Sequence, residues 1–306
     1  MTEIPTSNFA DVYSQQRQAI TGVAFFLIPY KKGQIVWTKL MEMLNGKFDI
    51  QELYEEDLAR GLKEGEKLYI PDVFKNGASG RIILKTSIDK VALTGSSLFG
   101  KATLDKPLSW SYRGFRIIII ATTEIHFLIC QDEKIKRHYL VILGSRVNSQ
   151  SLFGRLNNFL QKVGLFAVPA GIDSDKIDGV REELHGELLD TTLDGFSTPK
   201  IKMKRIIGKG FQDEASYLID VNMSSIHQHM FAYNASNTPK SPRKVVTISE
   251  DALVRFYSAT TYDEYEWFLR RYIFPILKQI EQPPTVPLIG FSAPEDIFKE
   301  VTEQEE

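Results

Sequence analysis

The chain has 306 residues, of which 43% are hydrophobic and 25% charged, and its formal net charge is −2. This composition is that of an ordinary soluble globular protein with enough apolar side chains for a sizeable core. The longest apolar runs, 23–28 and 117–121, are far shorter than the ~20 residues that a membrane-spanning helix requires. We therefore expect no membrane partner.

Cys130 is the single cysteine of the sequence. One cysteine excludes an intramolecular disulfide and a zinc site built on several cysteines. Residues 1–9 show no basic region followed by an apolar stretch, so no secretory signal is visible. The default expectation is a reducing, cytoplasmic location.

Charge is unevenly distributed along the chain. Residues 281–306 contain seven acids and one lysine, a net charge of −6, so the remaining 280 residues sum to +4. A mildly basic body thus precedes an acidic tail. Acidic tails commonly act as solvated segments that aid solubility, and this one could also compete with ligands for a basic surface.

The first region, 1–66, is predicted to be mainly helical. A helix is expected to follow Ser7 and to end at Gly22, and Val23–Ile28 is predicted to be a buried strand because of its β-branched and aromatic content. A second helix is expected near Ile35–Leu44. Apolar residues repeating every four positions predict a short third helix over 54–62.

The second region, 67–190, begins with short apolar runs separated by turn signals, which predict six strands: Ile82–Leu84, Ile88–Leu93, Leu108–Tyr112, Phe115–Thr122, Ile125–Cys130 and Tyr139–Leu143. Their connections are too short for helical crossovers, so we expect an antiparallel sheet. Because Ile117–Ile120 is apolar on both faces, we expect a central strand that is covered on each side.

Two helices are predicted to complete this region. Ser149 is expected to cap the first, whose apolar stripe runs from Leu152 to Val163. The second is expected over Asp175–Leu189.

The third region, 191–282, is predicted to contain strands and one long helix. The expected strands are Lys200–Ile207, Ser216–Val221 and Val245–Ile248. Thr261 and Glu264 form a capping-box pattern for a helix that continues to residue 280 with a kink at Pro275. The acidic tail, 283–306, is expected to be disordered. The fold class is therefore α+β, with a largely antiparallel sheet or sheets and helices packed on the faces.

Positive side chains concentrate between Gly195 and Gln212, where five occur without an acid: Lys200, Lys202, Lys204, Arg205 and Lys209. The first three alternate with Ile201 and Met203, which is the periodicity of a strand with ammonium groups on one side and apolar groups on the other. Arg205 would join the ammonium side only if the strand ended or bulged there.

Basic groups of this kind suit two interpretations. Lysines and aromatic rings on a sheet can follow a phosphate backbone and stack bases, and Arg137 and Arg243 could extend such a patch. Lysines on one face of a strand also protect an exposed sheet edge from aggregation.

The segment Gly95–Lys101 has the G-x-x-x-x-G-K spacing of a phosphate-binding loop. The next residue is Ala102, so the hydroxyl that would coordinate Mg²⁺ is missing, and no helix start follows. We therefore predict a β-turn here.

His227 and His229 lie two positions apart, so on a regular strand both would face the same side, a spacing that can hold a metal. A metal site needs a third ligand, and Asp220, the nearest acid, has no evident reason to converge on the pair. We expect no metal site and no cofactor.

No catalytic nucleophile is evident, since Cys130 lies in an apolar run that is typical of an inert core thiol. The sequence favours a non-catalytic intracellular binding protein with a basic sheet face for nucleic acid or another polyanion. Two alternatives remain open. One is an enzyme that processes nucleic acid or nucleotides with acids from distant segments, and the other is a protein–protein adaptor.

Overall fold

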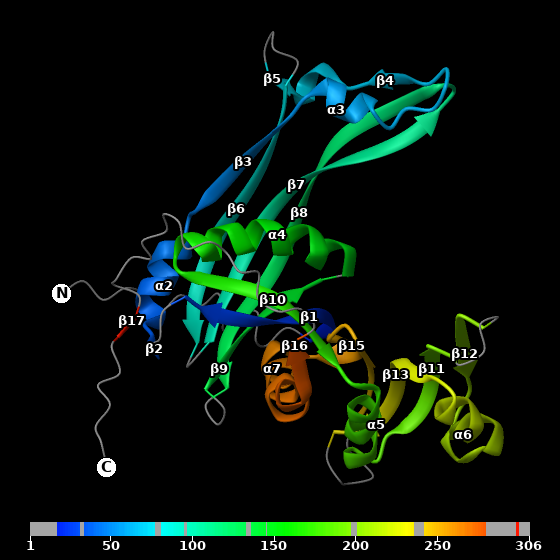
Figure 1. Cartoon of the computed structure of the whole chain (residues 1–306). Helices are drawn as coiled ribbons and strands as arrows, with labels where there is room; N and C mark the ends of the chain where they lie inside the picture. The colour runs from blue at the N-terminus through cyan, green and yellow to red at the C-terminus, as the bar shows by residue number, and fades with distance from the viewer. Residues whose placement is uncertain are drawn as a thin grey trace.

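The structure, a computed structural model, describes residues 17–30, 34–76, 81–94, 97–132, 136–144, 146–196, 201–235, 242–279 and 298–299. These residues form a mixed α+β fold whose sheet is mostly antiparallel, as the sequence predicted (Figure 1). None of the helices within these ranges has the length and apolar character that crossing a bilayer requires.

The described strands form one 15-stranded sheet and a separate two-stranded sheet. The path across the large sheet is β12 (Met203–Ile207), β11 (Glu187–Asp194), β13 (Ser225–Asn234), β14 (Arg243–Ser249), β15 (Leu253–Thr260), β1 (Gln18–Pro29), β9 (Arg137–Leu143), β8 (Phe115–Asp132), β7 (Ser97–Tyr112), β6 (Arg81–Thr94) and β3 (Phe48–Leu53). Four short strands attach beside this path: β10 (Leu165–Ile172), β16 (Leu277–Gln279), β4 (Lys67–Tyr69) and β5 (Lys75–Asn76).

Strand β1 joins the two strand-rich regions of the sequence. One of its edges pairs with β9, and the other pairs first with β15 and then with β10. Its side chains alternate between two cores: Val23, Phe25 and Leu27 pack into one, whereas Ala24 and Phe26 pack into the other. The sheet is therefore covered on both faces at β1, which explains the continuous apolar run there.

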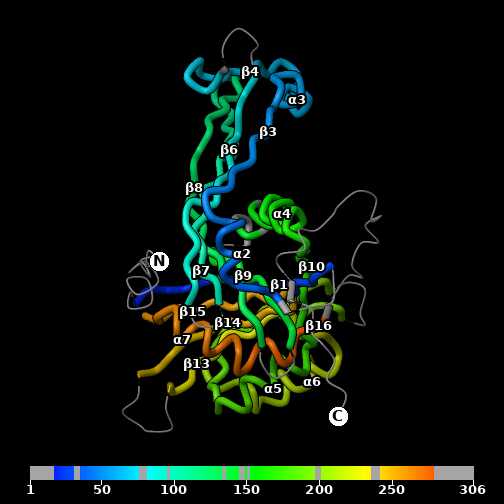
Figure 2. The backbone as a smooth tube through the Cα atoms, turned by 90° about the vertical axis from the view of Figure 1, so that its left-hand side faces the viewer, coloured from blue at the N-terminus to red at the C-terminus, as the bar shows by residue number. Residues whose placement is uncertain are grey.

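Helices supply both covering layers. The core that contains Val23 is completed by α2 (Trp37–Leu44) and α4 (Arg146–Lys162). The opposite core is completed by α5 (Ser174–Glu183), α6 (Ala215–Asn222) and α7 (Tyr262–Phe268). Figure 2 shows α4 on one side of β1 and β9, with α5, α6 and α7 grouped beyond the opposite side.

Strands β6, β7 and β8 are so long that they extend past the body and, with β3, β4 and α3 (Glu55–Ala59), form a projecting arm (Figures 1 and 2). The arm has a small apolar core of its own around Ile70, Ile82, Leu84 and Ile118.

The arm corrects the prediction of a doubly covered strand at Ile117–Ile120. Ile118 is buried in the small core, but Ile117 and Ile119 are only half-buried, because this part of β8 lies beyond the covering helices (Figure 1). Among the described strands, β1, β9, β10 and the later part of β8 (residues 127–130) contribute side chains to both large cores and are covered on both faces there.

The six strands predicted between residues 82 and 143 all lie in strand structure, but they are segments of four longer strands, β6, β7, β8 and β9. The breaks expected inside β6 and β8 and the turn expected at 105–107 are therefore wrong, because each of these strands continues without interruption. Four other expectations were wrong. Three of these concern predicted elements: Gln18–Ile20 opens β1 instead of ending a helix, Ser216–Val221 lies in helix α6, and β11 takes residues 187–189 from the expected second helix. The fourth is an omission, since strand β10 (Leu165–Ile172) was not predicted. Short apolar runs suit helix and strand equally well, so tertiary packing decides between them.

Helix α4 is confirmed, but it starts before Ser149, which therefore does not cap it. The Ser149 side chain instead donates a hydrogen bond to the carbonyl oxygen of Ile142, 3.4 Å away, and so ties the helix to β9.

The capping box at the start of α7 is confirmed. The Thr261 hydroxyl accepts a bond from the Glu264 amide at 3.2 Å, and the Glu264 carboxylate accepts one from the Thr261 amide at 3.0 Å. The helix does not continue past Pro275 with a kink. A short π-helix over Leu269–Ile273 and a 3₁₀ turn over Phe274–Ile276 lead directly into β16. Proline lacks the amide hydrogen that a continuing helix would need.

Most of the predicted acidic tail lies outside the described residues. Within it, Phe298–Lys299 (β17) pairs antiparallel with Gln34–Ile35 (β2) and makes the two-stranded sheet.

Gly100 on β7 lies directly opposite Phe127 on β8. A Cβ at position 100 would fall 2.1 Å from Cζ of Phe127, which is fully buried. We predict that Gly100→Ala lowers the free energy of unfolding by about 2 kcal/mol or more, because the ring has no free space into which it can move. Urea denaturation of the full chain measures this.

The matched control is Gly154→Ala on α4, where an added Cβ meets nothing within 4 Å. That change should raise the free energy of unfolding by about 0.5–1 kcal/mol, because alanine favours a helix over glycine. Equal stabilities of the two variants would contradict the packing described for Gly100.

Candidate functional site

We call Lys200, Lys202 and Lys204 the lysine ladder, and the segment that carries them is only partly a strand. Lys200 lies outside the described residues, and Lys202 is exposed just before β12 begins at Met203. Lys204 bonds to the carboxylate of Asp220 on α6. The side of β12 that carries Lys204 also carries Ile206, which packs against the core.

The opposite side of β12 carries Met203, Arg205 and Ile207. Met203 and Ile207 are exposed, so the apolar residues face outward here. Arg205 lies on this side, as a regular pleat requires, and its Nε is 3.0 Å from both carboxylate oxygens of Asp190. Lys204 and Arg205 thus each have a carboxylate partner. Lys209 is exposed in the loop that follows β12.

Arg137 and Arg243 do not adjoin the ladder. Arg137 begins β9, six strands from β12 along the sheet, a separation of roughly 29 Å at the usual strand spacing. Its guanidinium lies 5.9 Å from the ring centre of Phe26. Arg243 begins β14 and pairs with Glu187. The predicted basic residues therefore occupy separate parts of the sheet.

The segment with phosphate-loop spacing joins two strands of a hairpin. Thr94 at the end of β6 pairs with Ser97 at the start of β7, and 97–101 is strand, so no helix begins within 97–101. Residues 95 and 96, where the turn was predicted, lie outside the described residues. Cys130 is fully buried, and that burial raises the pKa of its thiol, which disfavours the reactive thiolate.

His227 and His229 do not share a side of their strand, because β13 carries a bulge between them. The register against β11 shifts so that Gln228 lies opposite Thr192 and Ile226 opposite Leu193, which leaves His227 without a direct partner. An extra residue of this kind re-aims the neighbouring side chains. The pair predicted from spacing alone is therefore split into two separate environments.

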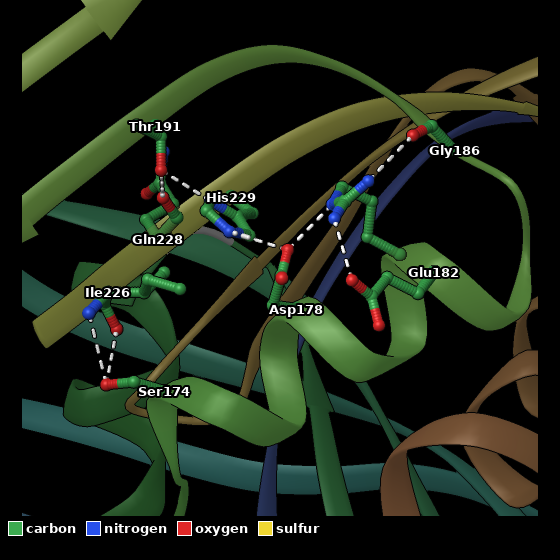
Figure 3. Close-up of polar contacts among 9 residues, drawn as sticks. Ser174, Asp178, Glu182, Gly186, Thr191, Ile226, Gln228 and His229 are labelled. Carbon is green, nitrogen blue, oxygen red and sulfur yellow. Dashed lines mark hydrogen bonds and ion pairs between the residues drawn. The ribbon is translucent and has the colours of Figure 1, made fainter. Parts of the chain in front are cut away.

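His229 is fully buried in a polar network between β11, β13 and α5 (Figure 3). Its Nδ1 hydrogen-bonds with the hydroxyl of Thr191, and its Nε2 lies 3.3 Å from Oδ1 of Asp178. The Thr191 hydroxyl also donates to the carbonyl oxygen of Gln228 at 3.2 Å. Hydroxyl, imidazole and carboxylate follow one another as in a catalytic triad, but Thr191 is also fully buried, so no substrate can reach its oxygen.

Arg181, one turn further along α5, completes this network. Its Nε donates to Asp178 at 2.7 Å, and its guanidinium also reaches the carbonyl oxygen of Gly186 and the carboxylate of Glu182 (Figure 3). Burial alone would raise the pKa of Asp178, but the hydrogen bonds from His229 and Arg181 outweigh it, so the pKa is lowered. The network anchors α5 to the sheet.

The second histidine environment, on the other side of the bulge, is partly open to solvent. His227 Nδ1 lies 2.7 Å from Oε1 of Glu250 and 3.5 Å from Oδ2 of Asp194. Asp194 ends β11, and Glu250 lies in the turn between β14 and β15. One imidazole and two carboxylates from two strands and one turn therefore meet at one point. Asp220, the acid that the sequence suggested, bonds to Lys204 instead.

The largest group of exposed aromatic rings described lies on the arm. Trp110 and Tyr112 on β7 pair with Ile117 and Phe115 on β8, so these four side chains share one face of the hairpin. Tyr69 on β4 pairs with Ile117 and extends the same face. The exposed fractions are 51% for Trp110, 57% for Tyr112, 44% for Phe115 and 53% for Tyr69. We call these four residues the aromatic face.

The reverse face of the hairpin is covered. Ser111 donates to Glu66 at 2.5 Å, Arg116 forms an ion pair with the same carboxylate at 3.2 Å, and Ile118 is buried. The arm therefore has one packed face and one open face. Sequence reasoning missed the open face because alternating apolar residues in a strand resemble a buried pattern, although the dense aromatic content of 108–115 was a usable signal.

Neither a search against protein-family models nor a search among curated proteins finds a match for this chain.

Asp178 should couple stability to pH. Its folded pKa is below the ordinary value of about 3.9, so its carboxylate stabilises the fold above pH 4, and this contribution is lost as the pH falls. We predict that Asp178→Asn lowers the free energy of unfolding by about 2 kcal/mol at pH 6, with a smaller difference at pH 3. Denaturant titrations at several pH values test this.

The control for Asp178 is Glu182→Gln, which removes an exposed carboxylate that contacts the same arginine at 3.4 Å. Its effect should stay within about 0.5 kcal/mol at every pH, as for other exposed ion pairs. A difference between wild type and Asp178→Asn that is the same at pH 3 and pH 6 would contradict the role of the carboxylate charge.

Proposed function

We propose that this protein is an adaptor that holds an acidic segment of a partner protein on the aromatic face of its arm. The observation that carries the proposal is a group of four exposed rings on one face of the arm: Trp110, Tyr112 and Phe115 on the β7–β8 hairpin, and Tyr69 on the adjoining strand β4.

Exposed rings on a sheet are suited to binding. Tryptophan and tyrosine are enriched among the residues that contribute most to binding at protein interfaces, because a large rigid ring buries much area at a small entropic cost. The arm that carries these rings projects away from the body (Figures 1 and 2), and the rings are 44% to 57% exposed. A partner can therefore reach the face without rearrangement of the core.

The charge around the face indicates the chemistry of the partner. Residues 106–116 contain no acid and three basic side chains, of which Arg116 lies on the reverse face and pairs with Glu66. Lys67, which pairs with Phe115 across β4 and β8, is exposed, and the Arg113 guanidinium lies 5.1 Å from the ring centre of Tyr112. A basic rim around an apolar centre favours a partner with an apolar anchor and flanking carboxylates.

Single-stranded nucleic acid is a second candidate, favoured by the same juxtaposition of Lys67 and Arg113 with exposed rings. Bases stack on aromatic side chains, and lysine and arginine follow the phosphates. This candidate keeps the polyanion binding predicted from the sequence but moves it from Lys204 and Arg205, which have carboxylate partners, to the arm.

A photo-cross-linking amino acid at position 112 tests both candidates in cells of the source organism. A discrete cross-linked protein is the result expected for the adaptor, and a product removed by nuclease would favour nucleic acid. The same probe at Tyr257 on β15, which is 44% exposed, is the control. Absence of any product specific to position 112 would overturn both candidates.

Affinity measurements should follow with the captured partner. The double variant Trp110→Ser, Tyr112→Ser should bind at least about tenfold more weakly, a loss of about 1.4 kcal/mol or more. Trp267→Ser, which removes a ring that is 56% exposed on α7, is the matched control and should leave affinity unchanged. Binding to nucleic acid would also fall steeply with salt, whereas adaptor binding should persist.

A further inference from the structure

We propose that Asp194, His227 and Glu250 form a binding site for one divalent cation of the Zn²⁺ type. We call these three residues the β13 bulge site. The inference is independent of the arm, because the site lies at the other end of the sheet path.

The geometry of the three side chains is close to that of a metal site. One ligand atom from each residue lies within 4.8 Å of the other two. Ligands of a tetrahedral zinc ion are about 3.3 Å apart when each lies about 2.0–2.1 Å from the metal. His227 Nδ1 is 3.5 Å from Asp194, which fits, and 2.7 Å from Glu250, which requires that carboxylate to move by well under 1 Å.

The backbone holds these side chains in place before any ion binds. The Glu250 amide donates to the carbonyl oxygen of His227 at 2.9 Å, and the Glu250 carbonyl oxygen accepts from the Ile172 amide at 2.8 Å. Asp194 pairs with Ser225 on β13 and with Met203 on β12. Three ligands on strand ends and a clamped turn lose little conformational freedom when they bind an ion.

The charge of the cluster also favours a cation. Two carboxylates converge on a single imidazole nitrogen, and in the part of the chain that the structure describes neither forms an ion pair with a lysine or arginine. Like charges this close oppose each other unless a proton or a metal lies between them. An ion at this point would bind both carboxylates and the imidazole at once.

The types of ligand and their accessibility define the metal. One imidazole with two carboxylates is a donor set that zinc accepts, and such a site leaves a fourth position for water. The side chains are 21% exposed for His227, 28% for Asp194 and 42% for Glu250, so the fourth position can face solvent. Because the ligands come from β11, β13 and the β14–β15 turn, the ion would cross-link three segments of the sheet.

Isothermal titration calorimetry of the full chain with ZnCl₂ tests the proposal. The protein is first treated with EDTA, and the EDTA is then removed. We expect saturable binding of one ion per chain and a thermal midpoint several degrees higher with the ion present. His227→Gln and Asp194→Asn should each weaken the binding at least about tenfold. Cobalt(II) should give visible absorption bands that ZnCl₂ abolishes, a readout that does not depend on the variants folding.

Two controls separate this site from adventitious surface binding. His185→Asn removes an exposed histidine at a position of positive φ that asparagine tolerates, and Asp173→Asn removes a carboxylate that pairs with Lys278. Both should bind zinc as wild type does. Absence of one-to-one binding in the wild type, or unchanged binding by the folded His227→Gln variant, would overturn the proposal and show that His227 serves only as a hydrogen-bonding partner.

Discussion

The backbone pairing of β1 is the constraint on which the rest of the structure depends. This strand comes first in the described chain, yet its partners β9, β10 and β15 arrive more than a hundred residues later. Its edges connect the strands β6–β9 to the strands β11–β15, and its two faces supply both cores. Without β1 the two halves would each have an unpaired edge and an uncovered apolar face, both of which are costly in water.

Strand length then divides the sheet into a body and an arm. Helices α2 and α4 cover the sheet only where it belongs to the body, so the parts of β7 and β8 that run beyond them keep an open face. The polar contacts of Glu66 with Ser111 and Arg116 stabilise the covered side of the hairpin. The four rings of the aromatic face are 44% to 57% exposed in the part of the chain that the structure describes, and the proposed binding role rests on that exposure.

At the opposite end of the sheet, a single inserted residue decides the chemistry. The bulge in β13 turns His229 into the core, where its Nδ1 hydrogen-bonds with Thr191 and its Nε2 lies 3.3 Å from Asp178, and leaves His227 partly open to solvent with Asp194 and Glu250. The buried network ties α5 to the sheet, and that attachment in turn fixes Ile226, whose amide and carbonyl both bond to Ser174 at the start of the helix (Figure 3). The two histidines therefore act independently although they are near neighbours in sequence.

The sequence by itself determined the fold class, the strand-rich centre of the chain, the capping box at Thr261 and the buried state of Cys130. These features are local, because each depends on the periodicity or hydrogen bonding of adjacent residues. Only the tertiary structure decided that Ile117 lies on an open face, that Asp220 and Asp190 bond to Lys204 and Arg205, and that Asp194 and Glu250 meet His227. Those outcomes depend on strand register and on one bulge, which bring together residues far apart in the chain and leave no periodic signal in the sequence.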